Sequence, residues 1–199
     1  MKKTLVASLA VLGLLAAPAR AAEFGLLLDK EIGHSEALGT QGSGLNPGTY
    51  QAASPTGLGF RAGYTFMDLK FAELGAAVTY HPRSQDTLSG PSAGKYGEQY
   101  LALGVQADWK LVMDLHAGLD MRSEKLSTTT NSGTDSTTVT RPWVKAGVGY
   151  ALPAPVLSPF VRLELAVPLT SYDAGTSTDD FRKAMAPSLQ VALYGGIRF

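Results

Sequence analysis

The chain has 199 residues, of which 45% are hydrophobic and 17% charged, and its 17 basic side chains balance its 17 acidic ones. This length suits one domain, the lack of cysteine excludes disulfide frameworks and thiolate chemistry, and zero net charge disfavours nucleic-acid binding. The charged fraction is below the roughly 25% of soluble domains, which indicates that part of the surface does not face water.

The first 21 residues have the pattern of a secretory signal peptide. Two lysines are followed by a short apolar stretch, residues 5–17, and by a small-residue cleavage pattern that ends at Ala21. We therefore expect cleavage after Ala21 and a mature domain of residues 22–199, which carries 14 basic and 17 acidic side chains. No later segment is apolar over the roughly 18 residues that a membrane-spanning helix needs.

Apolar and polar residues alternate along most of the remaining chain. Between residues 57 and 67 the even positions are apolar and the odd positions are mostly glycine, a period of two that is typical of a strand. Most such segments exceed the usual strand length of about five or six residues and match the roughly nine to eleven of a membrane-crossing strand. In chain order, the expected strands are residues 23–29, 57–67, 69–80, 98–110, 112–122, 139–151, 159–168 and 189–199.

The connections between these strands alternate in length. Short connections are expected near residues 68, 111 and 152–158, and long ones over residues 30–56, 81–97, 123–138 and 169–188. This order predicts an all-β, eight-stranded antiparallel up-and-down barrel with four long loops on one side and three short turns on the other. Ten of the fourteen residues 127–140 are Ser or Thr, which predicts a mobile loop there, and no amphipathic helix is expected.

Two kinds of barrel fit the alternation. A soluble, lipocalin-like barrel would place the apolar face inside, whereas a transmembrane barrel would place it outside. The transmembrane barrel is favoured because the charged face is rich in glycine, which suits a narrow and crowded interior, and because outward aromatic residues gather at one end, as at a membrane interface. These expected interface aromatics are Phe24, Phe66, Trp109, Tyr150 and Phe199.

In a transmembrane barrel the charged face must point into the lumen, because a cationic side chain facing lipid costs about 2–4 kcal/mol near the midplane. Lys70 is on the opposite face, beside a turn, where this cost is small. Acidic and basic side chains occur on the lumen face in similar numbers, so we expect a salt-bridged plug, with a narrow gated pore as the alternative. The predicted lumen network consists of Arg61, Glu73, Glu98, Asp108, Asp114, His116, Asp120, Arg122, Arg141, Lys145, Arg162, Glu164 and Arg198.

The last strand places Leu193, Ile197 and the terminal Phe199 in one outward register. This ending resembles the C-terminal assembly signal of bacterial outer-membrane barrels, which the barrel-insertion machinery reads. With the leader and eight strands, the mature chain resembles a small outer-membrane β-barrel of the OmpA-like or OmpW-like kind, which implies a protein embedded in outer-membrane lipid. Two features depart from the pattern: Gly195 takes the place of a bulky outward residue, and Pro142 lies within the sixth segment, where we expect the long-loop rim.

Function is less constrained, because this fold hosts structural, adhesive, transport and lipid-modifying proteins. We expect a structural or surface-interaction barrel whose long loops meet an unknown surface ligand. The resemblance to OmpW-like barrels implies an alternative, a transporter of small or hydrophobic solutes. A periplasmic lipocalin-like ligand binder is a second alternative.

One histidine, His116, is a candidate catalytic residue. His116 has lumen parity beside Asp114 and Asp120, which could orient its imidazole in a lipid hydrolase similar to the barrel lipid A deacylases. Such deacylases carry a His-x-Ser element near the end of the chain, whereas the last two expected strands of this chain contain no histidine. We therefore expect no enzyme and no catalytic residue.

Three residues are candidate metal ligands: Glu31, His34 and Glu36. They supply at most three ligands on a glycine-rich connection, which is weak support for a metal site. We expect a solvated loop there, and neither a metal nor a cofactor.

Overall fold

The computed structural model describes residues 21–32, 37–39, 48–52, 55–69, 71–91, 94–131, 133–152, 154, 156–172 and 177–199. Lys70 and all of the expected leader except Ala21 lie outside these residues. Eight long strands dominate the fold: β1 (Ala21–Ile32), β4 (Thr56–Leu69), β5 (Ala72–Ser89), β6 (Gly94–Lys110), β7 (Asp114–Thr130), β8 (Gly133–Ala151), β9 (Ser158–Pro168) and β10 (Leu189–Arg198).

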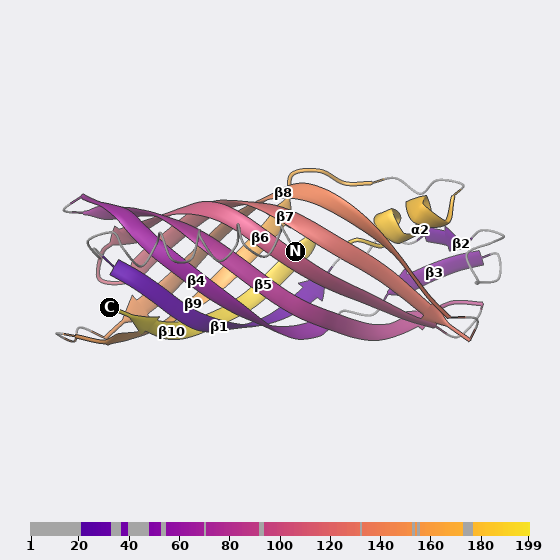
Figure 1. Cartoon of the computed structure of the whole chain (residues 1–199), viewed down its shortest axis with the longest axis horizontal. Coiled ribbons are helices and arrows are strands. Elements are labelled where there is room, and N and C mark those ends of the chain that lie inside the picture. The colour runs from indigo at the N-terminus through magenta and orange to yellow at the C-terminus, as the bar shows by residue number, and fades with distance from the viewer. Residues whose placement is uncertain are drawn as a thin grey trace, which may run out of the picture.

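The eight strands close into one antiparallel barrel. Each strand from β4 to β10 pairs with its neighbour in the chain, and β1 closes the barrel by pairing with β4 and β10. The strands are tilted around the long axis, with the C-terminus at one end and the remaining short elements at the other (Figure 1). We call these the terminal end and the hairpin end. The expected all-β, up-and-down barrel is confirmed.

Side chains alternate between the lumen and the outer surface. In β9, Arg162 and Glu164 are 2% and 3% exposed, whereas Leu163 and Leu165 are 50% and 52% exposed. The polar face therefore points inward, and the lipocalin-like alternative, which requires an apolar interior, is wrong. The exposed apolar residues form an outer surface, the apolar band, which runs from the terminal end up to Leu28, Tyr80, Leu101, Met121 and Val144.

Two hairpins extend beyond the apolar band. Residues 81–97 and 123–138 were expected to be long connections, but β5 continues to Ser89, β6 begins at Gly94, β7 continues to Thr130 and β8 begins at Gly133. The prediction of a mobile Ser/Thr-rich loop was wrong, because threonine favours extended backbone and alternate positions are buried: Leu126 and Val139 are 0% and 6% exposed.

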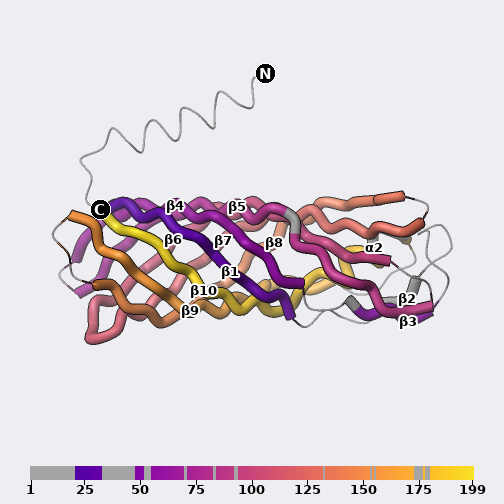
Figure 2. Tube along the Cα trace, turned by 90° about the horizontal axis from the view of Figure 1, so that it is seen from below, coloured from indigo at the N-terminus to yellow at the C-terminus, as the bar shows by residue number. Residues whose placement is uncertain are grey.

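Short elements cover the lumen at the hairpin end. Strands β2 (Ala37–Gly39) and β3 (Gly48–Ala52) form a pair, and β3 also pairs with the end of β5. Helix α2 (Thr178–Ala184) lies beside them in the two views (Figures 1 and 2). Its capping box joins Ser177 and Asp180, but its seven residues are too few to show a clear helical period in the sequence, so the helix was missed. No described helix is long and apolar enough to cross a membrane.

Candidate functional sites

Ion pairs lie inside the lumen at the level of the apolar band. Arg61 Nη1 lies 2.6 Å from Glu164 Oε1, and Arg162 Nη2 lies 2.6 Å from Asp108 Oδ1. The imidazole of His116 lies 2.9 Å from Asp108 through Nδ1, so the carboxylate that orients it comes from the adjacent strand β6 and not from the two aspartates on its own strand. These oppositely charged groups therefore form a buried ion-pair network inside the barrel.

Glycine allows the strands to accommodate these side chains. A Cβ at Gly104 would collide with the carboxylate of Asp120 and would lie 2.6 Å from the carbonyl oxygen of Leu119. The same Asp120 carboxylate is 3.0 Å from Lys145 Nζ. The glycine-rich lumen face therefore supplies space that a larger residue would remove.

The terminal end has its own ion-pair cluster. Arg198 Nη2 lies 3.2 Å from Glu23 Oε2, and its Nη1 lies 3.6 Å from Glu73 Oε2. Lys110 Nζ lies 3.2 Å from Asp68 Oδ1 and 2.6 Å from Glu73 Oε1. Of the residues predicted from the sequence to line the lumen, Asp114 and Arg198 are half-buried and the others are buried.

Several buried polar side chains were missed from the predicted network. His81 Nε2 lies 2.9 Å from Asp29 Oδ1, and its ring stacks on Tyr100 with 4.9 Å between centroids. Gln190 donates to Asp29 and, at 3.1 Å, to the hydroxyl of Tyr100. The alternation contained the signal for His81, which continues the inward register of Thr79, but the predicted strand ended one residue too early.

A second charged layer lies closer to the hairpin end. Arg141 holds Glu124 Oε2 through Nε at 2.7 Å and Nη2 at 2.6 Å, while Trp143 Nε1 donates to Glu124 Oε1 at 2.5 Å. The guanidinium of Arg122 lies over the rings of Trp143 and Tyr100, 4.0 and 4.7 Å from their centroids. Glu124 was not predicted, because its segment was expected to be a loop.

Two further carboxylates, those of Glu31 and Glu98, face this layer. They lie beyond the apolar band, because the outward residues next to them on their strands, Lys30 and Gln99, are polar. Burial, and then the neighbouring carboxylate of Glu31, raise the pKa of Glu98 well above its ordinary value. Ser84 Oγ lies 3.4 Å from both carboxylate oxygens of Glu31. Neither carboxylate oxygen of Glu98 has a hydrogen-bond partner among the described residues.

Of the three residues considered as metal ligands, only Glu31 is among the residues that the structure describes. Glu31 is 1% exposed and faces the lumen, and His34 and Glu36 lie outside the described residues. Among the residues that the structure describes, no three acidic or histidine side chains come together as a metal site would require.

An apolar cap covers the charged layer. The ring of Phe181 in α2 packs edge-on against Tyr50 of β3, with 5.7 Å between centroids, and Arg182 Nη2 lies 3.1 Å from Asp135 Oδ2 of β8. The cap consists of Tyr50, Leu88, Tyr96, Leu126, Val139, Phe181, Ala184, Met185 and Ala186, with Tyr172 at its edge. It closes the hairpin end with side chains from both the barrel and the covering elements.

The expected interface aromatics are exposed on the outer surface near the terminal end. Their exposed fractions range from 39% for Trp109 to 50% for Tyr150 and Phe199. Phe24 and Phe199 pack edge-on with 5.9 Å between centroids, and the backbone of Phe199 exchanges two hydrogen bonds with Ala22. Leu193 and Ile197 also face outward and are 48% and 40% exposed.

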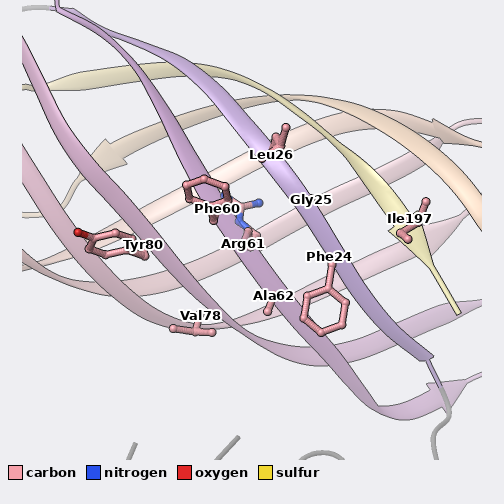
Figure 3. A pocket seen from close by; sticks show the side chains of 9 residues that line it. All are labelled: Phe24, Gly25, Leu26, Phe60, Arg61, Ala62, Val78, Tyr80 and Ile197. Carbon is pink, nitrogen blue, oxygen red and sulfur yellow. The ribbon is translucent and has the colours of Figure 1, made fainter. Parts of the chain in front are cut away.

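A shallow apolar groove of about 460 Å³ crosses β1, β4 and β5 on the outer surface (Figure 3). Phe24, Leu26, Phe60, Ala62 and Val78 are among the residues that line it. The groove belongs to the apolar band, and most of the residues that line it are apolar.

Comparison with known proteins agrees with this architecture. The family model described as "Outer membrane protein beta-barrel domain" matches residues 7–186. The chain belongs to this family. A search of curated proteins finds no match. Membership of the family and the outward apolar band together place the barrel in outer-membrane lipid.

Two solved structures are similar to this chain at low sequence identity. Ail, the attachment invasion locus protein of Yersinia pestis, in complex with the heparin analogue sucrose octasulfate, is 12% identical, with a TM-score of 0.50 over 90% of this chain and 98% of Ail. Neisserial surface protein A is 13% identical, with a TM-score of 0.48 over 89% of this chain and 97% of that protein. The likeness to Ail supports the fold alone.

Proposed function

We propose that this protein is a closed surface-interaction barrel whose hairpin end faces the outside of the cell and binds an extended polypeptide segment along one edge of β8. The orientation follows the usual arrangement of outer-membrane barrels, in which the turns near the termini face the periplasm. The leader and the outward residues of the last strand fit export and recognition by the insertion machinery.

The buried ion pairs and the apolar cap support an interaction role over a transport role. Buried ion pairs such as Arg61–Glu164 occupy the barrel at the level of the apolar band, and the apolar cap lies above them. Opening a continuous path would separate buried charges, which is costly. We therefore expect no stepwise conductance in planar bilayers, and no catalytic step is part of the proposal.

The open edge of β8 is the observation that carries the proposal. Strand β9 ends at Pro168, opposite Trp143, so the part of β8 from Gly133 to Arg141 pairs with β7 alone. No other backbone partner of this part occurs among the described residues. Such an edge presents free backbone donors and acceptors, which commonly recruit an additional strand.

The direction of these backbone groups follows from Pro142. Its carbonyl oxygen accepts a hydrogen bond from Leu169 N at 2.8 Å, so its backbone polar groups face away from β7. Because these directions alternate along a strand, the N–H and C=O groups of the alternate residues toward the hairpin face the same open edge. These residues are Thr140, Thr138, Ser136 and Thr134.

Two substitutions at Thr138 test this edge. Thr138→Pro removes one donor on the open edge and leaves the hydrogen bonds with β7 intact, whereas Thr138→Val removes the hydroxyl but keeps the N–H. The probe is a labelled peptide that copies residues 122–130, the part of β7 that pairs with this part of β8 on its other side. Binding to the barrel in lipid vesicles is followed by fluorescence anisotropy.

We expect the peptide to bind the wild type and Thr138→Val with similar affinity and Thr138→Pro at least about fivefold more weakly, as the loss of one hydrogen bond requires. A peptide N-methylated at alternate amides should bind weakly to all three proteins. Failure of the wild type to bind, equal binding by the two variants, or full binding of the N-methylated peptide would each contradict the proposal.

A further inference from the structure

A polar hollow of about 210 Å³ lies on the outer wall formed by β6, β7 and β8. We call it the outer hollow. Hydroxyl, amide and ammonium groups dominate its lining, and the carboxylate of Glu98 is buried on the lumen side of the wall. The residues that line it are Glu98, Gln99, Lys125, Ser127, Thr134 and Ser136.

Two exposed lysines flank the outer hollow. Lys125 lines it, and Lys95 is paired with Thr129, whose hydroxyl lies 2.9 Å from the hydroxyl of Thr134. Neither lysine makes an ion pair with any residue that the structure describes. Lys110 at the terminal end differs, because Asp68 and Glu73 hold it. The positive charge beside the outer hollow is therefore available to an external anion.

The outer hollow lies directly above the apolar band. Gln99 is two residues beyond Leu101, and Lys125 is four residues beyond Met121, the last outward apolar residues of β6 and β7. Gln99 Nε2 also donates to the hydroxyl of Tyr80, at the edge of the band, over 3.3 Å. Gln99 and Lys125 therefore place the membrane side of the hollow next to the apolar band, where lipid headgroups lie. From there Ser136 and Thr134 extend the hollow toward the start of β8 at Gly133.

We propose that the outer hollow binds the phosphorylated sugar headgroup of a glycolipid in the surrounding leaflet. Lysine ammonium groups bind phosphate as point charges, and hydroxyl and amide side chains can donate to and accept from sugar hydroxyls. The position above the apolar band allows the acyl chains of the same molecule to lie against Leu101 and Met121. The inference uses the orientation proposed above. The hollow shares Thr134 and Ser136 with the open edge of β8, but lipid binding does not require a peptide to be bound there.

The test compares variants with equal changes in charge. Lys95→Gln combined with Lys125→Gln removes both lysines of the site, while Lys30→Gln combined with Lys183→Gln removes two lysines that do not line it. Each protein is refolded in vesicles containing diphosphorylated or dephosphorylated lipid A, extracted in mild detergent and analysed by native mass spectrometry. A mobility shift on boiling verifies that each variant is folded.

We expect the wild type and the control variant to retain diphosphorylated lipid A, and the site variant to bind it about fivefold more weakly per lysine, or roughly 25-fold in all. Dephosphorylated lipid A should be lost from all three. Equal retention by the site variant, an equal loss in the control variant, or equal retention of the dephosphorylated lipid would overturn the inference. Equally tight binding of the free headgroup without acyl chains would also overturn it, because the occupant would then be a soluble anion.

Discussion

Replacing Glu164 by Gln should strongly destabilise the barrel. The Glu164 carboxylate is 2.6 Å from Arg61, 3.5 Å from Arg162 and 3.8 Å from His116, and the residue is 3% exposed. The substitution keeps the side-chain volume but leaves Arg61 buried without its ion-pair partner. Breaking a buried pair in this way costs about 3–5 kcal/mol, so we expect the free energy of unfolding to fall by that amount.

A double-mutant cycle separates this electrostatic effect from packing. Arg61→Met alone should also be strongly destabilising, whereas Arg61→Met combined with Glu164→Gln removes both charges and should recover most of the loss. Unfolding in urea is measured in lipid vesicles, with the folded fraction read from the mobility of unboiled samples. Single variants within about 1 kcal/mol of the wild type, or strictly additive effects, would refute the reasoning.

Two further substitutions probe the hairpin end. Phe181→Ala removes a side chain that is 1% exposed and packs on Tyr50. We expect the cap to lose about 3–5 kcal/mol of local stability, with faster proteolysis at the hairpin end and an unchanged mobility shift on boiling. Resistance to protease equal to that of the wild type would argue against the cap. The pKa of Glu98 is raised by burial, so its native state binds a proton more tightly than the unfolded state, and stability should fall as pH rises above about 4.5. Glu98→Gln should reduce this dependence of stability on pH and should stabilise the protein at pH 7. Urea midpoints measured across pH would check both expectations, and an unchanged dependence on pH would contradict the assignment.

The predicted strand ends were least accurate where the sequence is rich in serine and threonine. Residues 127–140 look like a loop by composition, because small hydroxyl side chains bury little apolar surface. In the structure residues 127–130 belong to β7 and residues 133–140 to β8, because Leu126 and Val139 on the inner face of these strands pack into the cap. Glu124 was missed for the same reason, and the cap could not be foreseen because Phe181 and Tyr50 are far apart in the sequence.

The sequence alone determined the number of long strands, their approximate positions and which face of each is polar. These properties depend on the order of neighbouring residues, because side chains alternate with a period of two along any strand. The same alternation identified lumen residues such as Arg61 and Glu164, but it could not pair them.

The tertiary structure decided the pairing and the available surfaces. Arg61 meets Glu164 across 103 residues of chain, the open edge of β8 exists because β9 ends at Pro168, and the outer hollow combines groups from three strands. Each of these depends on strand register and on the relative lengths of neighbouring strands. These contacts form only when all the strands pair around the closed barrel, so they cannot be read from any one strand alone.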